Sequence, residues 1–168
     1  MVALPGNQAA NGENKPQPAA SEEAGLLDSV SKVKTFIKQN KLDNVQLLGQ
    51  YKHEKVISLI KNSCFLIFPS ECYETFGRVI IEAYACGIPV IASHIGAMKE
   101  IFRDKKTGLY FEPGNPMDLA TKIKWAWTHP KEMQKIGKAA RKEFETKYNS
   151  KRNYEILMKI YRKVLNNH

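Results

Sequence analysis

The chain has few cysteines and no long apolar run. Cys64, Cys72 and Cys86 form no C-x-x-C pair and have no histidine at metal-ligand spacing, which argues against a zinc site and a disulfide framework. Cys64 and Cys86 sit among apolar residues, so we expect them in the core. Apolar runs such as CFLIF and IPVIA are far shorter than the ~20 residues that cross a bilayer, and no secretory leader pattern is present. We therefore expect a soluble, cytoplasmic protein.

Acidic residues are scarce toward the C-terminus. The net charge is +9, and residues 131–168 hold eleven Lys and Arg against four Glu. A basic, solvated surface explains this excess, and attraction to an anionic lipid surface or an anionic substrate is the alternative. Nucleic-acid binding is not expected, because the chain lacks a zinc finger, an RNP-like signature and an aromatic-rich basic strand.

Large apolar residues are also scarce in residues 1–24, which are rich in Ala, Asn, Gln, Pro and Gly. Such a segment buries too little surface to order itself, so we expect a disordered or appended leader. Residues 25–168 are long enough for one domain with a single core.

Residues 25–168 alternate between two patterns of apolar residues, continuous runs and helical spacing. Continuous apolar runs predict buried strands at residues 44–49, 64–68, 88–93 and 107–111. Helical spacing predicts helices near residues 26–37, 56–60, 76–85, 98–102, 116–127, 133–144 and 154–164. This alternation is typical of an α/β fold with a doubly wound, Rossmann-like parallel sheet, here followed by C-terminal helices.

Two apolar stripes mark the C-terminal helices. We expect each stripe to lie in the core or in an interface: Met133, Ile136, Ala140 and Phe144 in one, and Tyr154, Leu157, Tyr161 and Val164 in the other. Trp125 and Trp127 cannot both face inward from one helix.

Two loops leave the carboxyl ends of predicted strands, PSECYETFG at 69–77 and SHIGAMKE at 93–100. In doubly wound sheets ligands bind outside these strand ends, so the loops are expected to flank one crevice. In the first loop Thr75 can cap a helix that the amides of Phe76, Gly77 and Arg78 open. Such a helix start attracts anions and predicts a phosphate site.

Glu74 and Glu82 lie eight positions apart across this helix start. At a rise of ~1.5 Å per residue they are separated by roughly 10 Å, which is marginal for a hydrolytic acid/base pair but suits a longer ligand with hydroxyls at both ends. Two simpler interpretations stay open. Glu82 can pair with Arg78 four residues earlier, and Glu74 can stabilise the helix dipole.

The stretch FPSECYETFGRVIIEAYACGIPVIASHIGAMKEI resembles the signature region of retaining glycosyltransferases of family 4, or group 1, which have the GT-B architecture of two facing Rossmann-like domains. Glu74 and Glu82 match both ends of their E-x7-E motif. The resemblance covers about residues 26–166 and implies a partial C-terminal, nucleotide-sugar-binding domain at 25–168.

The resemblance also implies roles for individual residues. Glu74, as the catalytic-site carboxylate, would hold hydroxyls of the donor sugar, and Glu82 those of the ribose. The segment from Thr75 through Phe76, Gly77 and Arg78 would meet the sugar and phosphate. Ser93 to Ala97, including Gly96, would form the second wall, with His94 as a candidate lining residue.

Part of the family pattern is missing from this chain. The glycine-rich turn with its Arg and Lys, two flanking strands and the acceptor-binding domain have no counterpart. The resemblance implies a UDP- or GDP-sugar donor, no metal or other cofactor, an N-terminal acceptor domain as partner, and an acceptor that can be lipid-linked at the inner face of a membrane. We expect this chain alone to be inactive. A non-catalytic nucleotide-sugar-binding module and a basic membrane-docking domain are the alternatives.

Overall fold

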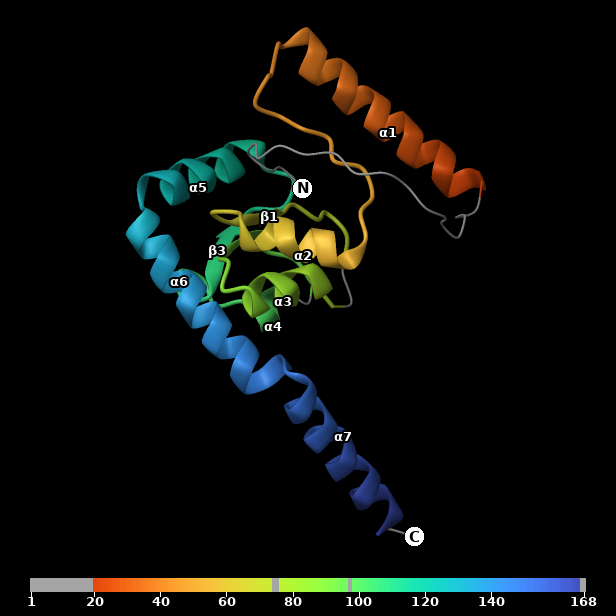
Figure 1. Cartoon of the computed structure of the whole chain (residues 1–168), viewed down its shortest axis with the longest axis vertical. Coiled ribbons are helices and arrows are strands. Elements are labelled where there is room, and N and C mark those ends of the chain that lie inside the picture. Colours follow the sequence, from red (N-terminus) through yellow and green to blue (C-terminus); the bar gives the residue numbers. More distant parts are fainter. Residues whose placement is uncertain (1–19, 74–75, 97, 167–168) are drawn as a thin grey trace. The chain divides into compact units, whose positions relative to one another are not determined.

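The computed structural model describes residues 20–73, 76–96 and 98–166, and it divides into two units, Met1–Gln50 and Tyr51–His168 (Figure 1). The first unit contains helix α1 (Ala20–Gln39). Most of the predicted leader lies outside the described residues, and α1 begins at Ala20.

The prediction of a strand at residues 44–49 is wrong. This segment follows α1 without pairing with a strand in the described part of the chain, and Leu47 is 46% exposed. A short apolar run becomes a strand only where a neighbouring strand satisfies its backbone N–H and C=O groups. The amide of Val45 instead donates to the carbonyl of Leu42.

The second unit is built on a parallel sheet of three strands, β1 (Leu66–Phe68), β2 (Val90–Ser93) and β3 (Gly108–Phe111), in the order β1-β2-β3. Ile67 pairs with Ile91, which pairs with Leu109. The three predicted strands of this unit are confirmed, and their carboxyl ends share one edge of the sheet.

Helices precede, connect and follow these strands (Figure 1): α2 (His53–Lys61), α3 (Arg78–Ala85), α4 (Met98–Ile101), α5 (Pro116–Thr128), α6 (Pro130–Glu143), the π-helical turn η1 (Phe144–Tyr148) and α7 (Ser150–Leu165). Local signals set their starts. The Asn115 side chain accepts from the amide of Asp118 ahead of α5, and Asn149 does the same for Arg152 in α7. No helix within residues 20–73, 76–96 and 98–166 is long and apolar enough to span a membrane.

The sheet is covered on both faces, as doubly wound folds require. Successive β2 residues show this directly, since Val90 and Ala92 belong to one apolar cluster while Ile91 belongs to the other. The first cluster includes Ile80 and Tyr84 of α3. The second cluster takes in residues of α5 and α6: Ala126, Met133 and Ile136.

Some predicted core positions are exposed. Cys64 lies at the surface, because it precedes β1 and sits outside the paired part of its apolar run, and Cys86 is half-buried at the end of α3. Of the two tryptophans, Trp127 is 60% exposed and Trp125 is half-buried, which confirms that they do not both face inward.

Candidate functional site

The carboxyl edge of the sheet brings the two predicted loops together. β1 ends at Phe68 and β2 ends at Ser93, which is fully buried. The Ser93 hydroxyl donates to the carbonyl of Ser70 at 2.5 Å and so joins the end of β2 to the loop after β1. The sequence motifs did not reveal this link between the two loops, because it joins residues 23 positions apart.

Three predicted site residues, Glu74, Thr75 and Ala97, lie outside the described residues. The others, Phe76, Gly77, Arg78, Glu82 and Gly96, can be placed. Helix α3 starts at Arg78, two residues later than predicted, with Gly77 as its N-cap and no side-chain cap. The Arg78 amide donates to the carbonyl of Phe76 at 2.8 Å, so this amide is already satisfied within the turn.

Gly77 is buried at the entrance of α3 because a neighbouring helix packs onto it. A Cβ atom at this position would lie 2.7 Å from the methyl and 3.1 Å from the sulfur of Met98. Met98 itself is fully buried at the start of α4. The glycine thus permits close packing of α3 against α4, a tertiary reason that the sequence did not disclose.

Glu82 makes the ion pair that the simpler interpretation predicted. Its Oε1 accepts from Nε of Arg78 at 3.0 Å and lies 3.8 Å from Nδ1 of His53. The Glu82 side chain is 18% exposed, whereas that of Arg78 is 77% exposed. An i, i+4 pair with an exposed arginine contributes only about 0.3–0.5 kcal/mol. The pair alone therefore does not offset the cost of half-burying the Glu82 carboxylate.

Aromatic rings line the remaining sides of the edge. The exposed ring of Phe76 meets Tyr148 of η1 edge-on at 6.4 Å. His94, exposed after β2, lies with its ring 4.2 Å from that of Tyr110. The Tyr110 hydroxyl donates to the carbonyl of Met98 at 2.7 Å, and burial raises the pKa of Tyr110 to about 12. Tyr110 thus ties β3 to α4.

Gly96 occupies the second loop in a left-handed conformation with φ of +55°. This conformation favours glycine and lets the chain turn into α4, where the Lys99 amide donates to the Gly96 carbonyl. Among the described residues no group of three or more His, Cys, Asp and Glu side chains could hold a metal ion.

The sequence pattern of the family "Glycosyl transferases group 1" matches residues 24–143. The chain belongs to this family. It is 34% identical over 130 residues to an uncharacterized glycosyltransferase of Methanocaldococcus jannaschii. The matched region covers 77% of this chain and 36% of that protein. The fold is that of a GT-B C-terminal domain.

Solved structures agree with this assignment. The structure of Anabaena HepE in complex with UDP-glucose superposes with a TM-score of 0.74 at 25% identity, covering 81% of this chain and 37% of HepE. The C-terminal domain of the group 1 protein LpcC from Francisella tularensis gives a TM-score of 0.67 at 26% identity, covering 74% of this chain and 64% of that domain. The chain therefore spans little more than a third of the archaeal relative and of HepE.

Proposed function

We propose that this chain binds a nucleoside diphosphate sugar at the carboxyl edge of its sheet and serves as the donor half of a retaining glycosyltransferase. The observation that carries the proposal is the joining of the two signature loops at that edge by Ser93 and Ser70. The structural similarity to HepE, which has been solved with UDP-glucose, supports a UDP-sugar as donor.

Glu82 is suited to hold the ribose. Both of its described contacts, to Arg78 and His53, are made by Oε1, and Oε2 has no hydrogen-bond partner among the described residues. Oε2 can therefore accept from a ribose hydroxyl while the Arg78 contact holds the carboxylate in place. A hydroxyl-to-carboxylate bond is charge-assisted and stronger than a neutral one.

The start of α3 is suited to the diphosphate and the sugar. The positive end of the α3 helix dipole attracts anions, and the exposed Phe76 lies just before Gly77, the N-cap of that helix. We assign Glu74 to the sugar hydroxyls, with Thr75 beside it, and the segment of Gly96 and Ala97 to the opposite wall. These roles extend the family resemblance to the positions that match its motif.

Transfer itself requires more than these loops. The acceptor oxygen must bond to the anomeric carbon on the face from which the diphosphate leaves, and cations must neutralise that leaving group. The chain spans 36% of its archaeal relative, so we assign acceptor binding and the cationic turn to a partner domain and expect no transfer by this chain alone. A non-catalytic binding module shares the same crevice and differs only in that transfer is absent when the partner domain is supplied.

Calorimetry with UDP, GDP and UDP-glucose tests the binding proposal. Glu82→Gln keeps the side-chain size and should weaken binding of the preferred nucleotide by about 1.5–3 kcal/mol, the range for hydrogen bonds to charged groups. Glu155→Gln is the matched control, because Glu155 also pairs with an arginine on an exposed helix face. Equal affinity for wild type and Glu82→Gln would reject the ribose assignment, and the absence of saturable binding to any of the three ligands would reject the function.

A further inference from the structure

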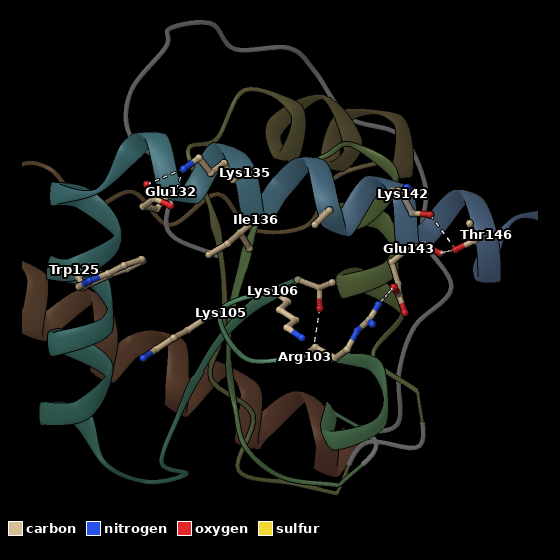
Figure 2. Close-up of a pocket in the computed structure, with 12 residues that line it drawn as sticks. Arg103, Lys105, Lys106, Trp125, Glu132, Lys135, Ile136, Lys142, Glu143 and Thr146 are labelled. Atoms are coloured by element: carbon tan, nitrogen blue, oxygen red, sulfur yellow. Dashed lines mark hydrogen bonds and ion pairs between the residues drawn. The ribbon is translucent and has the colours of Figure 1, made fainter.

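A groove of about 700 Å³ lies where β3 begins, at the edge of the sheet opposite the crevice. One side is formed by residues of the turn that leads into β3: Arg103, Lys105, Lys106 and Thr107. Helix α6 forms the other side, with Trp125 of α5 at one end (Figure 2). This volume is in the range of small-molecule sites, roughly 300–1,000 Å³. The proposed donor site uses the other ends of the strands and leaves the groove without a role.

The acidic groups of the groove are already neutralised. Glu132 pairs with Lys135 at 3.2 Å, both on α6. Glu143 is buried and pairs with Arg103 across the groove and with Lys147 at 2.6 Å. Burial by itself would raise the pKa of Glu143. The hydrogen bonds and charges of Lys147 and Arg103 together outweigh burial and hold that pKa below its ordinary value.

Three further cations line the same groove with no acid to pair with. Lys105 and Lys106 come from the turn and Lys142 from α6, and none of them has an ion-pair partner among the described residues. Figure 2 shows the turn residues and Lys142 on opposite sides of the groove. Unpaired cations facing one cavity create a positive potential that favours an anionic ligand.

The backbone of the turn is held in an unusual conformation. Lys105 has φ of +58°, a left-handed region that glycine adopts easily and lysine rarely. The conformation is held by a bond from the Lys105 amide to the Gly108 carbonyl, 2.8 Å, and one from the Arg103 amide to the Thr107 hydroxyl, 2.9 Å. These two bonds hold Lys105 in the turn at the side of the groove.

The rest of the lining is apolar. Trp125 stacks on His129 with ring centroids 4.6 Å apart and planes 9° apart, which fixes the indole at the end of the groove. Ile136 of α6, buried, adds an aliphatic surface. The groove thus offers cations for an anionic group and apolar surface for carbon atoms.

We propose that this groove binds a small phosphorylated organic molecule. Its phosphate lies between Lys105 and Lys106 of the turn and Lys142 of α6, and its carbon skeleton packs against Trp125 and Ile136. The site is separate from the proposed donor crevice and does not depend on it.

Binding of ribose 5-phosphate, ribose and inorganic phosphate to the whole chain tests the proposal by calorimetry. We expect saturable binding of ribose 5-phosphate, weaker binding of inorganic phosphate and none of ribose. The double variant Lys106→Ala/Lys142→Ala should weaken ribose 5-phosphate binding about tenfold or more. Lys55→Ala/Lys124→Ala removes the same charge from residues outside the groove and should change the affinity little.

Lys105→Gly separates binding from folding. Because glycine suits the left-handed turn, this variant should keep or raise the melting temperature while it weakens ribose 5-phosphate binding. Raising the salt concentration should also weaken binding, since the cations are open to solvent. UDP affinity should be unchanged in all the lysine variants, and Glu82→Gln should leave ribose 5-phosphate binding intact.

Three results would overturn the proposal. The first is no saturable binding of ribose 5-phosphate to the wild-type chain. The second is equal affinity in wild type and Lys106→Ala/Lys142→Ala. The third is competition between UDP and ribose 5-phosphate, which would place both ligands in one site.

Discussion

Helices α6 and α7 resemble each other in sequence and differ in what covers them. Each carries one apolar stripe and a basic polar face. In α6 the stripe is buried, with Met133 and Ile136 each 4% exposed and Ala140 not exposed at all. In α7 no residue is buried, and Tyr154 and Tyr161 are 63% and 54% exposed.

An apolar stripe therefore predicts that one face of a helix can be buried, but it does not predict which part of the protein buries it. In α6 the stripe bridges both apolar clusters, with Ile136 in one and Ala140 in the other. The α7 stripe was expected to lie in the core or an interface, and it is not in the core of this unit. Exposed patches of this kind mark contact surfaces.

The largest expected contrast is in stability. Ile136→Ala should lower the free energy of unfolding by about 2–5 kcal/mol, because it leaves a cavity in a packed cluster. Leu157→Ala in α7 removes a side chain that is already 44% exposed and should cost about 0.5 kcal/mol or less. Urea unfolding followed by circular dichroism measures both, and equal losses would show that α7 is covered in solution.

A second contrast concerns a glycine in α6. A Cβ atom at Gly137 would lie 2.3 Å from the carbonyl oxygen of Gly87. Gly137→Ala should therefore destabilise the protein by about 1–3 kcal/mol, although the same change at an exposed helix position would stabilise by about 1 kcal/mol. Thermal unfolding gives the sign, and a higher melting temperature would contradict the close contact.

Glu143 at the end of α6 should make stability depend on pH. Its pKa is lowered in the folded state, so its contribution is present above its ordinary value of 4.5 and is lost as the pH falls through the lower folded value. Glu143→Gln should remove about 1–2 kcal/mol near neutral pH and flatten the stability profile at acid pH. Melting temperatures between roughly pH 3 and 7 measure this, and parallel profiles for both proteins would refute it.

The smallest expected effect tests α7 as a lipid-binding surface. Lys151, Arg152, Lys159, Arg162 and Lys163 oppose a single acid, Glu155, on this helix. If α7 meets anionic lipid, co-sedimentation with phosphatidylserine vesicles should fall with added salt, and Lys163→Ala should weaken it about fivefold. Lys55→Ala in α2 is the control. If neither added salt nor Lys163→Ala changes vesicle binding, the basic face of α7 is an ordinary solvated surface.

Local patterns predicted most of the second unit. The run that became β2 is apolar on both faces because both are covered, and the helix predicted near residues 116–127 is α5. The segment 44–49 failed because pairing depends on a neighbouring strand, which local composition does not supply.

In the candidate site too, local sequence predicted some contacts and missed others. The Arg78–Glu82 pair follows from helical spacing and was foreseen as an alternative. The Ser93–Ser70 bond and the packing of Met98 on Gly77 are tertiary contacts, so no local spacing could predict them.

The strand order β1-β2-β3 repeats the order of synthesis. Each strand pairs with the one made just before it, after a single intervening helix, so a ribosome-bound chain can complete the sheet without waiting for a distant segment. Helix α6 then emerges and closes both apolar clusters at once, through Ile136 and Ala140. A nascent chain released before Met133 would therefore expose both clusters and become a substrate for chaperones.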